Sequence, residues 1–152
     1  RRLTRIPAPI RTQISIAELF TDLKKLFPEE EFQFEVPTPE LKLNADRTQI
    51  EQILINLLKN AREACSRKSD KKIQVKARKL SAGNTTLTIS DNGEGILPDV
   101  LDKIFVPFFT TKTSGSGIGL SLCKQIMTLH EGSINVKSEV GKGSSFILTF
   151  PK

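Results

Sequence analysis

Every strand-like segment of this sequence has one apolar face. In segments such as 73–77 and 134–136, apolar and polar residues alternate, as they do in a β-strand that buries one face. Other segments carry apolar residues at the spacing of an amphipathic helix. Strands with one apolar face predict a sheet that is covered on one side only. The sequence therefore predicts an α/β (α+β) two-layer sandwich, in which about three helices cover one face of a mixed, mostly antiparallel sheet.

The expected elements can be placed along the chain from this alternation and spacing. The predicted strands are 12–16, 32–36, 41–43, 73–77, 87–89, 134–136 and 146–150. The predicted helices are 16–27, 46–65, a short one at 97–103, and 117–130. Asp46 and Gln49 resemble a capping box at the start of the 46–65 helix. Segment 105–117 has no period and predicts a loop.

Length and composition favour one soluble domain. The chain has 152 residues, of which 38% are hydrophobic and 26% charged. Two prolines in segment 1–9 end any helix that arrives from upstream, so 1–9 predicts a linker and 10–152 the domain. The pattern of a signal peptide or a membrane span is absent from the sequence. Cys65 and Cys123 lie in helical patterns and do not suggest a disulfide framework, so we expect a cytoplasmic setting, either of a soluble protein or of part of a membrane receptor.

Asp91 is the first residue that the fold alone does not explain. It continues the two-residue phase of the strand before it, so its carboxylate is expected on the apolar side of the sheet, where it needs a partner. The sequence Asp-Asn-Gly is also a common hairpin turn, but here it leads into a helix instead of a returning strand. Gly93 and Gly95 then suggest close backbone approach to a bound molecule. A carboxylate in such a pocket would accept a hydrogen bond from an exocyclic amine such as that of adenine.

Asn56 and Asn60 lie four residues apart and therefore on one face of the 46–65 helix. Asparagine is a poor helix former, so a pair of them inside a helix needs a reason. One interpretation is a pair of exposed amides. The other is that the Asn60 amide oxygen binds Mg²⁺, which prefers oxygen ligands and is commonly shared with phosphates.

A glycine-rich segment, Gly115-Ser116-Gly117-Ile118-Gly119-Leu120, runs directly into the last predicted helix. The N-terminus of a helix offers free N–H groups to a phosphate. The spacing fits neither the dinucleotide fingerprint nor the P-loop, and the alternative interpretation is a flexible linker. Lys112, in the loop before this segment, is a candidate for contact with a terminal phosphate as a point charge.

Together these features resemble, in order and spacing, the catalytic ATP-binding domain of sensor histidine kinases, a member of the GHKL/HATPase superfamily. The resemblance covers nearly the whole chain and implies the Bergerat ATP-binding fold that gyrase-type and chaperone ATPases share. Residues 60–64 and 105–112 look most like those of kinases of the nitrogen-regulation type. The matching segments are an asparagine box at 56–61, glycine boxes at 91–96 and 115–120, a phenylalanine box at 105–112 and a last glycine turn at 141–146.

The resemblance implies roles for individual residues. Asn60 would bind Mg²⁺ and, with Lys112, act in catalysis, while Asp91 would contact the adenine amine. Leu57, Ile96 and Phe105 would line the base pocket, and residues 108–117 would form a lid over the phosphates. Glu63 stands where many relatives carry a basic residue, so we do not expect it to touch phosphate. The implied cofactor-binding residues are Asn56, Leu57, Asn60, Asp91, Gly93, Gly95, Ile96, Phe105, Thr110, Thr111, Lys112, Gly115, Ser116, Gly117, Ile118, Gly119 and Leu120.

The resemblance also implies a reaction. Related ATPases carry a glutamate that activates water four residues before the metal-binding asparagine, whereas this chain has Asn56 there, and an amide cannot act as that base. This favours transfer of the ATP γ-phosphate to a protein histidine over hydrolysis. The only histidine, His130, lies at a helix end, where a capping role is the ordinary explanation. The acceptor histidine is therefore expected on a separate dimerisation domain.

The implied partners are ATP or ADP, the histidine-bearing dimerisation domain of the same protein and the receiver domain of a response regulator. We expect the full-length protein to be a homodimer, with or without a membrane anchor, and this chain alone to be a monomer. One alternative is a serine-kinase anti-sigma factor, which would share the nucleotide site. Another is a non-catalytic module that uses its net charge of +6 to bind nucleic acid, but the basic residues are scattered rather than striped, so nucleic-acid binding is not expected.

Overall fold

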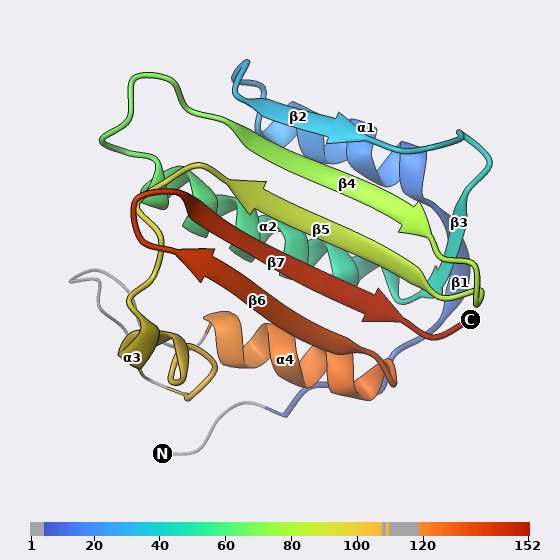
Figure 1. Cartoon of the computed structure of the whole chain (residues 1–152). Helices are drawn as coiled ribbons and strands as arrows, with labels where there is room; N and C mark the ends of the chain where they lie inside the picture. The colour runs from blue at the N-terminus through green and yellow to red at the C-terminus, as the bar shows by residue number, and fades with distance from the viewer. Residues whose placement is uncertain (1–4, 108, 110–118) are drawn as a thin grey trace.

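The computed structural model describes residues 5–107, 109 and 119–152, which form two layers (Figure 1). A five-stranded sheet makes one layer, and α1 (Ile16–Leu26), α2 (Arg47–Ala64) and α4 (Gly119–Leu129) make the other. The predicted two-layer sandwich is therefore confirmed. The remaining elements are β1 (Thr12–Ser15), β2 (Phe32–Glu35), β3 (Lys42–Ala45), β4 (Ile73–Lys79), β5 (Thr85–Asp91), α3 (Pro98–Leu101), β6 (Ser133–Glu139) and β7 (Gly143–Phe150).

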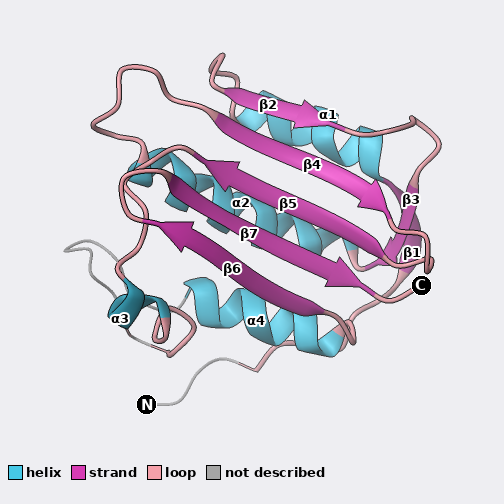
Figure 2. Cartoon of the chain, viewed as in Figure 1, coloured by secondary structure: helices cyan, strands magenta, loops and turns pink. Residues whose placement is uncertain are grey.

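The strands of the main sheet lie in the order β2-β4-β5-β7-β6. β2 and β4 are parallel and the other neighbours are antiparallel, which confirms a mixed, mostly antiparallel sheet with its helices on one face (Figure 2). β1 and β3 pair with each other in a separate two-stranded sheet at one end of the molecule. Alternation predicted these two strands, but it carries no information on pairing and could not place them outside the main sheet.

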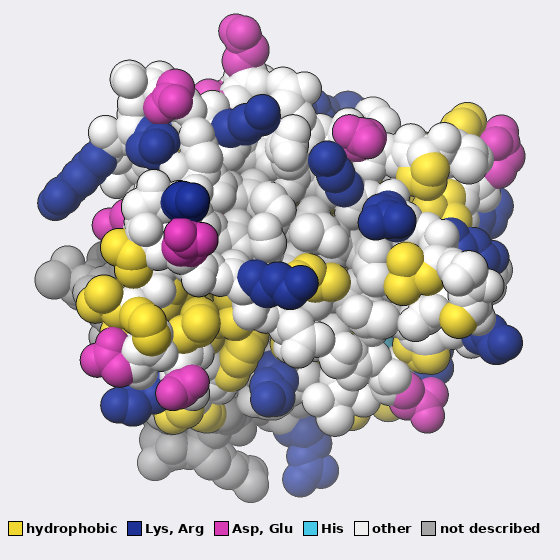
Figure 3. Space-filling model, in the orientation of Figure 1, with side chains coloured by type: hydrophobic (Ala, Val, Ile, Leu, Met, Phe, Trp, Pro, Cys, Tyr) yellow, Lys and Arg dark blue, Asp and Glu magenta, His cyan; other side chains and the backbone are white. Residues whose placement is uncertain are grey.

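The apolar stripe of α2 packs against the inner face of the sheet. Burial of such a stripe contributes about 25 cal/mol per Å² of apolar surface, so α2 contributes strongly to holding the two layers together. The outer face of the sheet is mostly polar, with scattered Lys and Arg side chains (Figure 3). Among the described residues, the helices are too short or too polar to cross a bilayer. Each residue of the stripe is 3% exposed or less: Ile50, Ile53, Leu54, Leu57, Leu58 and Ala61.

The first turn of α2 is held by hydrogen bonds from distant parts of the chain. Asp46 caps the helix, because its Oδ1 accepts the Gln49 N–H at 3.1 Å. The predicted capping box is only half formed: the Gln49 side chain donates to Pro7 O at 2.9 Å and does not return to the Asp46 N–H. That N–H instead donates to Nε2 of His130, at 3.1 Å. A tertiary contact has therefore replaced the local one.

His130 follows α4 and is only 2% exposed. Since Nε2 accepts from Asp46, Nδ1 carries the ring proton and donates to Ile126 O at 2.9 Å. The ring also meets the Phe150 ring edge-on, with centroids 6.3 Å apart. His130 thus satisfies a carbonyl at the end of α4, as its position predicted, and it also joins that end to the start of α2.

The segment before β1 lies along the same junction. The Ile10 N–H donates to Asp46 Oδ2 at 2.9 Å, and the Arg11 guanidinium donates to Leu129 O at 3.0 Å. Part of the predicted linker, residues 5–9, is described, and its Pro7 carbonyl accepts the bond from α2. The boundary at residue 9 stays a prediction, but the residues around it are fastened to the ends of both α2 and α4.

Candidate functional site

Asp91 is the last residue of β5, and its side chain lies on the inner face of the sheet, as its phase predicts. Its Oδ1 accepts the Gly93 N–H at 2.8 Å, and the Ser144 N–H on β7 also donates to the carboxylate. Burial raises the pKa of Asp91; the two N–H donors oppose the rise and the charge of Glu94 adds to it. The result is a partly buried carboxylate at the end of an apolar sheet face.

The loop 91–96 lies between the end of α2 and the turn that joins β6 to β7. The Glu94 N–H donates to Ala64 O, in the last turn of α2, at 3.1 Å. On the other side, the Glu94 carbonyl accepts the Gly141 N–H at 2.9 Å. The loop is therefore held by both layers of the sandwich.

Gly93 and Gly95 allow this close packing. A Cβ on Gly93 would lie 2.4 Å from Ala64 O, and one on Gly95, where φ is +79°, would lie 2.4 Å from Glu139 O. The predicted close backbone approach is therefore made to the protein's own backbone. Contact of either glycine with a ligand stays a prediction.

Asn92 fastens the loop that follows α2, a role that sequence reasoning missed. Its Oδ1 accepts the Lys72 N–H at 2.9 Å, and its Nδ2 donates to Asp70 O at 2.8 Å. The Cys65 thiol is 3.5 Å from the same Oδ1, and burial, followed by the Asp91 charge, raises the pKa of this thiol. The sequence Asp-Asn-Gly was interpreted either as a hairpin turn or as a loop that approaches a ligand. Neither interpretation assigned a role to the side-chain amide of Asn92.

Asn56 joins α2 to the start of α4. Its Nδ2 lies 4.0 Å from the Cys123 Sγ, and a Cβ on Gly119 would lie 3.8 Å from the Asn56 side chain. Burial raises the pKa of Cys123 to about 12. Cys65 and Cys123 are both free and buried, which agrees with the expectation that they form no disulfide.

Asn60 lies one turn further along α2, partly buried, between Asn56 and the turn that contacts the loop 91–96. The part of the chain that the structure describes contains no group of His, Cys, Asp and Glu side chains that would hold a metal by itself. A cation at Asn60 would therefore take most of its ligands from water and from the phosphates of a nucleotide, as Mg²⁺ commonly does.

The predicted base-pocket residues lie on the border of the core. Leu57 is 1% exposed, and Ile96 and Phe105 are partly buried against the same cluster. Leu120, from the second glycine box, also packs against it. The Phe105 ring also lies 5.5 Å from the Lys124 Nζ on α4, a cation–π contact that was not predicted. The described residues of the predicted site thus come from α2, the loop 91–96, the segment after α3 and the start of α4.

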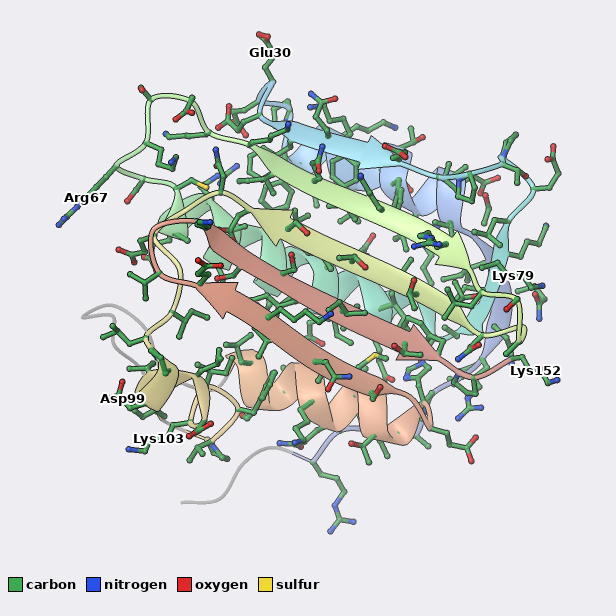
Figure 4. All side chains as sticks on the ribbon, in the orientation of Figure 1. Glu30, Arg67, Lys79, Asp99, Lys103 and Lys152 are labelled. Carbon is green, nitrogen blue, oxygen red and sulfur yellow. The ribbon has the colours of Figure 1, made fainter. Side chains whose placement is uncertain are left out.

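Several predicted site residues lie outside the described residues, and the structure says nothing of their positions. The segment that follows the first glycine box, residues 97–107, is described and contains α3. Asp99 and Lys103 project from the surface there (Figure 4). A separate groove of about 470 Å³, lined by Glu30, Glu31 and residues 68–71, contains none of the predicted site residues. The predicted residues outside the described part are Thr110, Thr111, Lys112, Gly115, Ser116, Gly117 and Ile118.

Two serines beside Asp91 were missed by the sequence analysis. Strand register aligns Asp91 on β5 with Ser144 on β7, and Ser144 with Ser138 on β6. Ser138 Oγ accepts the Ile96 N–H at 2.8 Å and lies 2.9 Å from Ser144 Oγ. Alternation places both serines on the inner face, but only the register shows that they continue the row of Asp91.

Comparison with known proteins identifies the family to which this fold belongs. A family profile described as histidine kinase-, DNA gyrase B- and HSP90-like ATPase matches residues 45–152. The sensor histidine kinase ZraS of Salmonella typhimurium is 40% identical over 110 residues, which cover 72% of this chain but only 23% of ZraS. The nucleotide-free catalytic domain of histidine kinase ThkA has a TM-score of 0.82 at 36% identity, covering 93% of this chain and 95% of that one. ThkA in complex with the response regulator TrrA has a TM-score of 0.75 at 32% identity, over 93% and 42% of the two chains.

The profile match includes Asn56, Asn60 and Asp91, and the structural match extends over nearly the whole sandwich. The nitrogen-regulation type stays a prediction. The match covers only 23% of ZraS, so the similarity does not by itself assign the activity of ZraS to this chain. This chain belongs to the family of histidine kinase-, DNA gyrase B- and HSP90-like ATPases, and its relatives in that family are sensor histidine kinases.

Proposed function

We propose that this domain binds Mg-ATP and positions the γ-phosphate for transfer to a histidine on a separate dimerisation domain. The single observation that carries the nucleotide site is the Asp91 carboxylate, partly buried at the end of an apolar sheet face and held by the Gly93 and Ser144 amides. A fixed hydrogen-bond acceptor in such a place suits the exocyclic amine of adenine. Ile96 and Leu57, which border the same core, would flank the base.

The phosphates would lie toward the start of α4. Asn60 would supply an amide oxygen for Mg²⁺, and the predicted lid, residues 108–117, would contact the phosphates through Lys112. When bound, Mg²⁺ would neutralise part of the phosphate charge. Asn56 cannot abstract a proton from water, which supports transfer over hydrolysis.

The acceptor histidine is proposed to lie on another domain because His130 is unsuited to the role. It is 2% exposed, and both ring nitrogens are engaged in hydrogen bonds within the fold. A buried ring without a free nitrogen cannot approach a phosphate in line. The dimerisation domain of the same protein would supply the histidine, and we expect a homodimer of cytoplasmic location.

A response regulator is the proposed partner after autophosphorylation. The support is the similarity to ThkA, whose structure was solved in complex with the response regulator TrrA. Phosphate would then pass from the histidine of the dimerisation domain to the receiver domain of the regulator.

Calorimetric titration with ATP, in the presence and absence of Mg²⁺, tests the site. We expect saturable binding that weakens without Mg²⁺ and is lost in Asp91→Asn. Asp70→Asn makes the same chemical change on a side chain that is 82% exposed, and it should bind as the wild type does. Failure of the folded wild type to bind ATP would overturn the proposal.

A further inference from the structure

The β6–β7 hairpin holds the loop 91–96 at its two ends. At one end, the Ser144 N–H donates to the Asp91 carboxylate. At the other end, the Ile96 N–H donates to Ser138 Oγ at 2.8 Å. The two serines are register partners, and their hydroxyl oxygens lie 2.9 Å apart. Hydrogen bonds therefore run from the proposed amine acceptor, across β7 and β6, to a residue of the proposed base pocket.

Counting protons assigns a direction to these bonds. The Ser138 hydroxyl has one proton, and Gly143 O accepts it at 3.1 Å. The contact with Ser144 Oγ must then be donated by Ser144, which fills the second acceptor position of Ser138 beside the Ile96 N–H. Ser138 thus uses all its hydrogen-bonding capacity within the fold. The Ser144 hydroxyl donates its single hydrogen bond to Ser138 and has no other hydrogen to donate.

We propose that Ser138 is a positioning residue for base recognition. It holds Ile96 in place, and it accepts the hydrogen bond that the Ser144 hydroxyl donates. Ser144 Oγ is thereby left as a hydrogen-bond acceptor beside Asp91. This inference rests on the proposed function. Two neighbouring acceptors favour a base edge that carries an amine and disfavour one that carries a carbonyl oxygen. Ser138 therefore contributes to the preference for adenine without touching the nucleotide.

The test compares Ser138→Ala with Ser138→Thr, which keeps the hydroxyl, and with Ser133→Ala, an exposed serine on the same strand. Dissociation constants are measured for ATP and for inosine triphosphate, in which a carbonyl replaces the amine. Loss of the Ser138 hydroxyl should weaken ATP binding by about five- to tenfold and lower the preference for ATP over inosine triphosphate by a similar factor. Ser138→Thr and Ser133→Ala should stay within about twofold of the wild type.

Hydrogen exchange of the Ile96 amide tests the positioning itself without nucleotide. We expect its protection to fall in Ser138→Ala and to be retained in Ser138→Thr, with the core amides unchanged. A folded Ser138→Ala protein with unchanged Ile96 protection and an unchanged preference between the two nucleotides would overturn the proposal. If Ser138→Ala loses protection at Ile96 but the wild type binds no ATP, then Ser138 does hold Ile96 in place, and only the proposed nucleotide site is wrong.

Discussion

Asp91 stands where a carboxylate is useful to a ligand and costly to the fold. Because burial raises its pKa, the folded protein binds a proton there more tightly than the unfolded chain does. Its contribution to stability is complete below its ordinary pKa of 3.8 and is lost as the pH rises through the raised value. Near neutral pH the ionised group therefore lowers the free energy of unfolding. Such a compromise between stability and activity is common at binding sites.

Replacing Asp91 by asparagine should separate the two effects. In the absence of nucleotide, Asp91→Asn should melt at a higher temperature than the wild type at pH 8. The difference should narrow as the pH falls toward the ordinary carboxyl pKa of 3.8, because the wild-type carboxyl takes up its proton. Thermal unfolding followed by circular dichroism measures the melting temperatures of the two proteins at each pH. Asp70→Asn serves as the exposed control, and a lower melting temperature for Asp91→Asn at pH 8 would show that the carboxylate stabilises the fold.

The sequence alone predicted Asp91 but not Ser138, for a physical reason. Asp91 is conspicuous because it is a charge in the apolar phase of its own strand, which local spacing reveals. Ser138 is a small polar residue near the end of β6, and its importance arises from the pairing with Ser144 on another strand. The same holds for His130, whose partner Asp46 lies far away in the chain. Single-residue patterns do not contain such pairings.

The turn between β6 and β7 illustrates how elements restrict one another. Gly141 and Gly143 both have positive φ, at +84° and +128°. A Cβ on Gly141 would meet no atom within 4 Å, whereas one on Gly143 would lie 2.0 Å from Asp91 O. The second glycine therefore allows β7 to pack directly against the end of β5.

The pair Gly141→Ala and Gly143→Ala should differ in stability accordingly. We expect Gly141→Ala to lower the free energy of unfolding by about 1–2 kcal/mol, the cost of a left-handed backbone. Gly143→Ala should cost at least about 3 kcal/mol, because backbone must move as well, and it should displace Asp91 and weaken ATP binding. Urea unfolding measures the difference, and equal losses in the two variants would contradict this account of the turn.

Most elements were predictable from sequence, and the departures lie where tertiary contacts take over. The helix stripe of α2 and the alternation of β4 and β5 were local signals, and both elements formed as expected. Only one half of the predicted capping box formed. The Asp46 side chain accepts the Gln49 N–H, but the Gln49 side chain donates to the Pro7 carbonyl and not back to Asp46. At the end of α4, Glu131 adopts a positive φ of +60°, and its N–H donates to Thr128 O at 2.9 Å.

At the scale of the whole molecule, the positive charge is spread around the surface. Figure 4 places Arg67 at one end of the sheet and Lys79 with Lys152 at the other, and Figure 3 shows no continuous basic stripe on the face in view. Binding to nucleic acid through such a surface would be weak and strongly salt-dependent.

Alone, this chain should be a monomer that binds ATP without turning it over. With labelled ATP we expect almost no phosphate release and no label on the chain, because Asn56 is no base and His130 is buried. Addition of a histidine-bearing dimerisation domain should give transfer of the label. Light scattering checks the mass, and rapid phosphate release by the chain alone would identify an ATPase.

The position of β7 has a consequence for biosynthesis. It is the last described strand in the chain, yet it lies inside the sheet, between β5 and β6. Until the ribosome has released β7, the edge of β5 that carries Asp91 is unpaired and open to association with other chains. The carboxylate also lacks Ser144 until then. If the proposed site is right, we therefore expect nucleotide to bind only after β7 has entered the sheet.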